Sequence, residues 1–204
     1  IAFAVDGAHR MQRLINDLLS FSRIGRLANE FTDVDLNAVV AAATAAVDES
    51  ILRADGTVES GDLPTIRGEE PLLVALFSNL LNNSLKFRRP DQPVRVRVTA
   101  TRSGDDWQIC FRDNGIGIEA EYADKVFVIF QRLHSREAYP GTGIGLAIAK
   151  RIVEHHGGRI WVDTTVDEGA AICFTVRTEP YAIPPAGADD TPAAEPVDAV
   201  KSAG

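Results

Sequence analysis

The sequence predicts an α+β domain: a two-layer sandwich in which helices cover one face of a mixed, mostly antiparallel sheet, preceded by an extended helix. Strand-like runs come in neighbouring pairs, most clearly over 94–101 and 107–112. Helical patterns separate these pairs, whereas a Rossmann-type chain alternates single strands with helices. The 204 residues are 45% apolar and 25% charged, which suffices for one domain with a core.

The extended helix is predicted over residues 1–28. An apolar stripe recurs there with helical spacing at Met11, Leu14, Ile15, Leu18 and Leu19. A single helix cannot bury such a stripe, so we expect a partner helix from this chain or from another.

The main domain is expected over 29–179. In chain order the patterns predict helices over 35–47, 69–87 and 142–156, and strands over 57–59, 65–66, 94–101, 107–112, 159–164 and 170–177. Asp33 or Asp35 suits the cap of the first helix, and Pro71 suits the first turn of the second. The two short strands are expected to pair with each other. Residues 180–204 are rich in Ala, Pro and Asp, which predicts a disordered tail.

Composition limits the classes of function. A formal net charge of −8 argues against non-specific nucleic-acid binding, which needs Lys and Arg to neutralise phosphates. No apolar run approaches the roughly 20 residues that span a bilayer, so we expect no membrane contact by this segment. The chain begins with Ile1 rather than Met, as expected of an excised segment. Cys110 and Cys173 are far apart in the sequence and lie in strand-like runs, which favours two buried core thiols over a metal or redox role.

Two glycine-rich motifs carry candidate chemistry. In Asp113-Asn114-Gly115-Ile116-Gly117-Ile118, a carboxylate at the end of a strand can accept a hydrogen bond from an exocyclic amine, and the glycines let backbone approach a ligand. In Gly141-Thr142-Gly143-Ile144-Gly145-Leu146, amides at the start of a helix suit a phosphate. Taken alone, the first motif also fits a simple turn. The second is weak alone, because neither a Walker lysine nor a βαβ unit accompanies it.

A polar row marks the helix predicted over 69–87. Asn79 and Asn83 lie one turn apart, Asn82 precedes Asn83, and Lys86 follows three residues later. Asparagine is unfavourable inside a helix, so the row calls for an explanation. Its amide oxygens suit a hard cation such as Mg²⁺, and the lysine suits a phosphate. The alternative is a solvated polar face, which Asn82 fits better than Asn83.

The segment 119–140 between the glycine motifs is long and irregular, which is typical of a ligand lid. It contains Phe127 and Phe130, followed by Arg132, a side chain that can reach a phosphate. The alternative for both phenylalanines is a place in the core, on a short helix.

The order of these motifs resembles one family. NLLNNSLKF, DNGIGI, VFVIFQRLH and GTGIGLAI resemble, in this order, the N, first glycine, F and second glycine boxes of histidine kinase ATPase domains. Those domains have the Bergerat fold, which gyrase, Hsp90 and MutL share. The resemblance covers about 35–178. RMQRLINDLLSFSR also looks like the second helix of the dimerisation and phosphoacceptor hairpin, and the chain looks most like kinases of the phytochrome-associated kind.

The resemblance implies a site for ATP and Mg²⁺. Asp113 would accept from the adenine amine, and Phe87 would pack on adenine. Asn83 would coordinate Mg²⁺, while Lys86 and Arg132 would face the phosphates; these three are the implied catalytic residues. The complete implied set is Asn79, Asn83, Lys86, Phe87, Asp113, Gly115, Gly117, Ile118, Arg132, Gly141, Thr142, Gly143, Gly145 and Leu146.

The chain departs from the family at two places. Ser84 stands where the family usually has Ala, a small change that should be tolerated. The acceptor histidine of the family has no match, so its helix is expected before residue 1. The four histidines present are each expected to lie at the surface or to cap a helix: His9, His134, His155 and His156.

The implied reaction is transfer of the γ-phosphoryl group of MgATP to a histidine, for relay to an aspartate of a response-regulator receiver domain. This chain alone is then expected to bind ATP without autophosphorylating. The parent is expected to be a bacterial, cytoplasmic kinase that forms a homodimer through the N-terminal helix. Two alternatives stay open. One is an anti-sigma-type serine/threonine kinase of the same fold, which would lack the dimerisation helix. The other is a catalytically silent nucleotide-binding oligomerisation module.

Overall fold

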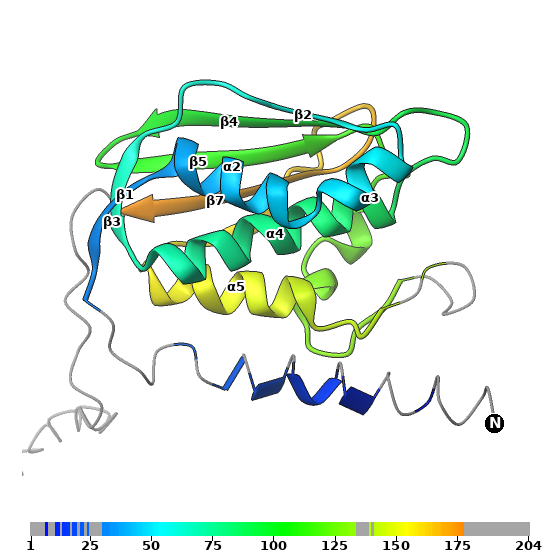
Figure 1. The fold of residues 1–204 in the computed structure, drawn as a ribbon, viewed down its shortest axis with the longest axis horizontal. Coiled ribbons are helices and arrows are strands. Elements are labelled where there is room, and N and C mark those ends of the chain that lie inside the picture. Colours follow the sequence, from blue (N-terminus) through cyan, green and yellow to red (C-terminus); the bar gives the residue numbers. More distant parts are fainter. Residues whose placement is uncertain are drawn as a thin grey trace, which may run out of the picture.

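The structure, a computed structural model, consists of two layers (Figure 1). It describes residues 30–133, 139 and 141–177, together with residues 7, 11, 12, 14–16, 18, 19, 21, 22 and 24. A five-stranded sheet forms one layer, and helices α2, α4 and α5 cover one of its faces. This confirms the predicted α+β sandwich. In the described part of the chain, no helix combines the length and the apolar character that crossing a membrane requires.

The sheet is mixed, as predicted, with the strand order β2-β4-β5-β7-β6. Its strands are β2 (Thr57–Ser60), β4 (Arg95–Ser103), β5 (Asp106–Asp113), β6 (Ile160–Val162) and β7 (Ala171–Arg177). Only β2 and β4 run parallel; the other neighbours are antiparallel. Alternation along β4 buries Val96 and Val98 under the helices and leaves Arg97 exposed, as the sequence predicted.

Four helices and two short 3₁₀ turns are described after residue 30. They are α2 (Leu36–Ala46), α3 (Asp48–Arg53), α4 (Glu70–Lys86) and α5 (Gly145–His155), with η1 (Ala120–Tyr122) and η2 (Lys125–Phe127) between the glycine motifs. Asp35 caps α2, because its carboxylate accepts from the backbone N–H of Asn37 at 2.9 Å. The central helix α4 sets Phe77 edge-on to Phe111 of β5, with 4.9 Å between ring centroids. The sequence did not predict α3.

The two short strands do not pair with each other, so that prediction was wrong. Strand β3 (Thr65–Gly68) pairs with β1 (Thr32–Asp35), which the sequence did not predict, and β2 joins the main sheet beside β4. Asn37 fixes the loop that connects β2 to β3. Its side chain accepts from the Leu63 N–H at 3.1 Å and donates to the Leu63 carbonyl at 2.8 Å. The chain therefore leaves the main sheet after β2 and starts a two-stranded sheet of its own.

Cys110 and Cys173 form a disulfide, so the prediction of two free core thiols was wrong. They are directly opposed in the β5–β7 register, with Cα atoms 4.1 Å apart. Their neighbours Ile109 and Phe174 point into the helical layer, so the disulfide lies on the opposite face of the sheet. The disulfide thus closes a loop between residues that are 63 positions apart in the sequence.

The N-terminal segment is helical at each described position from 11 to 22. Met11, Ile15, Leu18 and Leu19 of the predicted stripe are about half exposed or more, whereas Leu14 packs against the core. The partner helix that this stripe needs stays a prediction. The tail predicted over 180–204 and the histidines at 9 and 134 lie outside the described residues.

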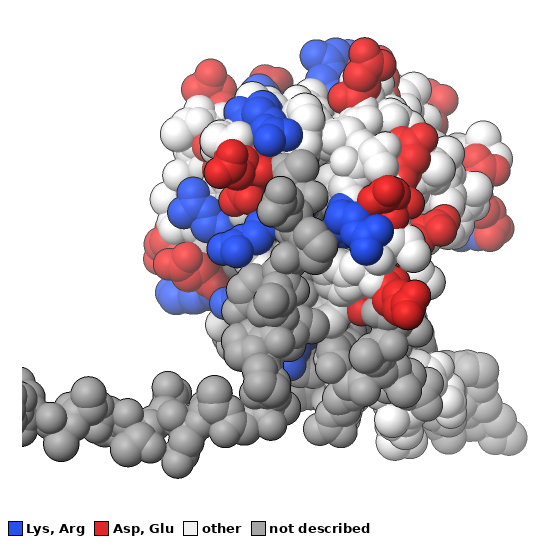
Figure 2. All heavy atoms as spheres, turned by 90° about the vertical axis from the view of Figure 1, so that its left-hand side faces the viewer, with Lys and Arg blue, Asp and Glu red and all other residues white. Residues whose placement is uncertain are grey.

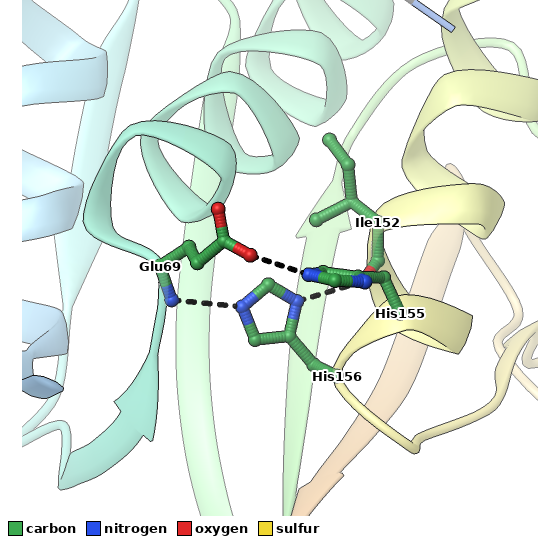
Figure 3. A network of polar contacts seen from close by, with 4 residues as sticks. All are labelled: Glu69, Ile152, His155 and His156. Carbon is green, nitrogen blue, oxygen red and sulfur yellow. Dashed lines mark hydrogen bonds and ion pairs between the residues drawn. The ribbon is translucent and has the colours of Figure 1, made fainter. Parts of the chain in front are cut away.

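A buried polar network lies where α5 ends and α4 begins (Figure 3). His155 Nε2 lies 2.5 Å from a carboxylate oxygen of Glu69, and their side chains are only 8% and 2% exposed. The Glu69 N–H donates to Nε2 of His156 at 3.1 Å, and Nδ1 of His156 lies 2.8 Å from the Ile152 carbonyl oxygen. Phe31 stacks on the His156 ring at 5.0 Å. The two histidines do end the helix, as predicted, but neither lies at the surface.

The outside of this end of the domain carries charges of both signs. Figure 2 views it from the left-hand side of Figure 1, and Lys and Arg side chains alternate there with Asp and Glu. An exposed ion pair between Arg67 of β3 and Asp33 of β1, with 3.4 Å between nitrogen and oxygen, lies across the small sheet. In the described part of this face, positive and negative side chains are therefore intermixed, and neither sign forms a continuous patch.

Candidate nucleotide-binding site

A cavity of about 220 Å³ lies between α4, the end of β5, the start of β7 and the segment that joins the two glycine motifs. Helix α4 gives the cavity its polar wall, and β5 and β7 give it a floor. Its lining residues are Asn79, Asn82, Asn83, Lys86, Phe87, Asp113, Gly117, Ile118, Val126, Gln131, Arg132, Leu133, Tyr139, Gly141, Thr142, Gly143, Gly145, Leu146, Ala170 and Ile172.

Asp113 is the fixed acceptor of the cavity. One carboxylate oxygen, Oδ1, accepts from the backbone N–H groups of Gly115 at 2.9 Å and Ala170 at 3.0 Å. The other, Oδ2, accepts from the hydroxyl of Ser84 at 2.9 Å. Glycine is required at 115, because a Cβ there would lie 2.5 Å from the carbonyl oxygen of Phe87. The first glycine motif thus packs tightly behind the carboxylate and aims it at the cavity.

The polar row of α4 faces the second glycine motif. Asn79 and Asn83 are partly exposed toward the cavity, and a Cβ placed on Gly145 would lie 3.3 Å from the amide oxygen of Asn79. A Cβ on Gly141 would lie 2.7 Å from Nζ of Lys86. Residues about 60 positions apart in the sequence therefore lie on one wall of the cavity, with the glycines in close contact with the polar row.

Two cations meet at this wall. Burial lowers the pKa of Lys86 below its usual value, and the positive charge of Arg132 lowers that pKa further. Arg132 itself donates to the backbone carbonyls of Gly141 and Tyr139, the latter at 2.6 Å. Two like charges held together in a partly buried cavity favour an anionic ligand between them.

The second glycine motif opens α5 later than predicted. Gly143 has a φ of 77°, a conformation that helices exclude and glycine tolerates, so α5 begins at Gly145 rather than Thr142. The residue before the helix, Ile144, has an apolar side chain and makes no capping hydrogen bond. The first amides of α5 are therefore available to a ligand, as a phosphate-binding helix terminus requires.

The family follows from comparison with known proteins. Residues 68–180, more than half of the chain, match the family described as histidine kinase-, DNA gyrase B- and HSP90-like ATPases. The chain belongs to this family. Within it, the relatives are sensor kinases and phytochromes, so this is an ATPase domain of the histidine kinase kind.

Two relatives and two solved structures illustrate the likeness. Cyanobacterial phytochrome A of Nostoc sp. is 41% identical over 176 residues, and phytochrome-like protein Cph1 of Synechocystis sp. is 37% identical; each match covers 86% of this chain but only 23% of the relative. The mycobacterial sensor histidine kinase MprB is 28% identical with a TM-score of 0.63, over 74% of this chain and 99% of that one. Full-length ShkA in complex with AMPPNP shares the fold, at 24% identity and a TM-score of 0.70, over 88% of this chain and 38% of that one.

This histidine-kinase-type domain brings the predicted site residues together. All of them line the cavity except Gly115, which packs behind Asp113. The roles assigned to them stay predictions. The two phenylalanines of the lid differ: Phe127 is buried on η2, as the core alternative held, whereas Phe130 is 60% exposed with a φ of 64°.

Several residues of the ATPase site were not predicted from the sequence, among them Val126, Gln131 and Leu133 of the segment between the glycine motifs. Tyr139 lies against Phe87, with 5.0 Å between ring centroids, and its position beside the glycine motif was the only signal available. Ala170 and Ile172 enter the cavity with the start of β7, which carries no motif. Ser84 was treated as a tolerated change, yet it contacts Asp113.

Proposed function

We propose that this domain binds MgATP and is the catalytic half of a sensor histidine kinase, transferring the γ-phosphoryl group to a histidine on a separate helix. The observation that carries the proposal is that one cavity contains both a fixed acceptor and two cations. Asp113, a carboxylate held by three donors, lines it together with Lys86, Arg132 and the start of α5. Nζ of Lys86 lies over the ring of Phe87, 4.5 Å from its centroid, so an aromatic surface adjoins the cations. A nucleotide needs these groups: an acceptor for an amine on its base, an aromatic surface for the base, and positive charge for its phosphates.

The donor set fits Mg²⁺ only together with a nucleotide. Asn83, with Asn79 beside it, offers neutral amide oxygens, which are hard ligands suited to this ion. In the described part of the chain, no group of three or more His, Cys, Asp or Glu side chains is placed to hold a metal. Mg²⁺ bound through substrate phosphates would neutralise charge on the transferring group. The chain itself would orient the phosphates with Lys86 and the α5 amides.

Phosphoryl transfer needs positioning and charge stabilisation more than a protein nucleophile. Asp113 would fix the adenine and Lys86 and Arg132 would fix the phosphates, leaving the γ-phosphoryl group to an incoming acceptor. His155 and His156 are not suited to be that acceptor, since their side chains are buried in the Glu69 network. We propose that the acceptor lies on the first helix of a hairpin whose second helix is residues 1–28.

The relatives support the partners that we propose. Sensor protein kinase WalK of Staphylococcus aureus is 33% identical over 83% of this chain. The histidine kinase ThkA, which shares the fold, forms a complex with the response regulator TrrA. We propose a response-regulator receiver domain as the phosphoryl acceptor downstream of the histidine. The exposed stripe of Met11, Ile15, Leu18 and Leu19 supports a homodimer through the N-terminal helix in the parent.

Calorimetry with the 204-residue chain tests the proposal. MgATP is expected to bind the wild-type chain, and Asp113→Asn is expected to abolish binding because an amide nitrogen would face the adenine amine. Unchanged affinity in Asp113→Asn would contradict the adenine role. With γ-labelled ATP, the chain alone is expected to gain no stable label on His155 or His156, and a label on either would contradict the separate acceptor.

A further inference from the structure

Ser84 is the one hydroxyl that contacts the Asp113 carboxylate among the described residues. It lies inside α4, only 6% exposed, and its Oγ is 2.9 Å from Oδ2 of Asp113. A second acceptor, the Leu80 carbonyl, is 3.4 Å away. A hydroxyl has one proton to donate, and a charged acceptor at the shorter distance gives the stronger bond. The proton therefore goes to Asp113.

Three donors from three segments hold this carboxylate. Two backbone N–H groups, of Gly115 and Ala170, occupy Oδ1, and the Ser84 hydroxyl occupies one side of Oδ2. A carboxylate has about four lone-pair positions. One position on Oδ2 is therefore left for a donor from the cavity. Without the hydroxyl, Oδ2 would have two open positions and no anchor on the α4 side.

We propose that Ser84 is a positioning residue that sharpens the selection of a base with an exocyclic amine. The inference rests on the proposed MgATP function, with Asp113 as the acceptor for adenine. Ser84 holds Oδ2 so that its last lone pair points into the cavity, where an amine N–H fits it. A base that lacks the amine leaves that lone pair unpaired, which costs affinity.

The effect is specific to Oδ2 because Ser84 contacts the carboxylate from behind and does not line the cavity. Ser84 is absent from the cavity lining, whereas Asp113 and Phe87 belong to it. A change at Ser84 therefore reaches the nucleotide through Asp113. Replacement by Ala removes one oxygen and lets Oδ2 turn or bind water, which a ligand amine must then displace.

The experiment measures dissociation constants by calorimetry on the full 204-residue chain. The ligands are MgATP and the Mg²⁺ complex of purine riboside triphosphate, which lacks the exocyclic amine. The variants are Ser84→Ala and the matched control Ser78→Ala, the same change on the same helix outside the cavity lining. Ser84→Ala is expected to weaken MgATP about fivefold, because the amine must displace a water from Oδ2 or reorder it, and the purine nucleotide less than about twofold. The control is expected to behave like the wild type.

The ratio of the two affinities decides the outcome. An unchanged ratio in Ser84→Ala would overturn the inference, as would equal weakening of both nucleotides, because a merely structural role affects both alike. Asp113→Asn separates this failure from that of the proposed function. If Asp113→Asn binds MgATP like the wild type, the adenine role and the inference fail together. If it loses MgATP while Ser84→Ala keeps the wild-type ratio, only the inference fails.

Discussion

His156 makes the stability of the domain depend on pH in a direction that its hydrogen bonds fix. Nε2 accepts from the Glu69 N–H at 3.1 Å, so Nδ1 must carry the proton that it donates to the Ile152 carbonyl at 2.8 Å (Figure 3). A second proton on Nε2 would face the Glu69 N–H and break that bond. The ring is therefore held neutral. Burial lowers its pKa and is the largest effect. The hydrogen bond to the Ile152 carbonyl opposes it, the adjacent His155 adds a smaller lowering, and the Glu69 carboxylate a still smaller raising.

The sign and size of the effect follow from proton binding. The folded pKa of His156 is below the unfolded value of about 6.5. Above pH 6.5 neither state binds the proton, and the full stability is present. As the pH falls below about 6.5, the unfolded chain takes up a proton that the folded chain refuses. The free energy of unfolding then falls by at most about 1.4 kcal/mol per pH unit, until the folded pKa is reached.

Urea unfolding at pH 7.5 and pH 5.5 measures this loss. The variant His156→Gln keeps a donor and an acceptor but does not titrate. Other groups lower the stability of both proteins, so the difference between their pH dependences isolates His156. The wild type is expected to lose up to about 1.4 kcal/mol more than the variant between the two pH values. Equal losses would refute the neutral, hydrogen-bonded histidine.

Two further predictions concern the disulfide of the sheet and the role of Lys86 in the cavity. Cys110→Ser opens the disulfide that closes 63 residues of sequence separation, and the chain-entropy model expects a loss of about 4 kcal/mol in urea unfolding; an unchanged midpoint, relative to oxidised wild type, would show that the bond with Cys173 does not stabilise the fold. Lys86→Ala is expected to raise the Kd of MgATP by about tenfold or more and leave that of adenosine unchanged, because Lys86 is proposed to face the phosphates. Equal weakening of both ligands in calorimetry would place Lys86 at the base instead.

Local periodicity was enough to predict the central elements. Helix α4 carries buried residues at helical spacing together with Pro71 in its first turn, and β4 alternates buried Val with exposed Arg. Each of these signals is complete within ten or twenty residues of sequence. Their boundaries were accordingly predicted to within two or three residues.

Long-range pairing could not be read in the same way. The partner of β2 is decided by a turn that Asn37 holds through Leu63, 26 residues away. Cys110 and Cys173 become neighbours only through the β5–β7 register. His155 and His156 are buried because Glu69, 87 residues from His156, begins α4 beside them. None of these contacts produces a periodic pattern of apolar residues in the sequence.

The site was predicted as far as its motifs extend. Asp113 and Lys86 lie in sequence motifs of distinctive composition. The residue types in these motifs, and the order of the motifs along the chain, were enough to predict both as site residues. Tyr139 and Ala170 reach the cavity through the course of the lid and the start of β7, which no motif encodes. Ser84 was visible as a departure from the family, but its bond to Asp113 needed the spatial arrangement of α4 and β5.

Hydrogen–deuterium exchange with and without MgATP tests the location of the nucleotide most directly. Binding in the cavity predicts slower exchange in peptides that cover residues 79–87, 113–118 and 141–146. Helix α2, over Leu36–Ala46, does not line this cavity and serves as the internal control, with no change expected. Protection of all three cavity segments would support the account. Protection confined to α2, or none at saturating MgATP, would contradict it.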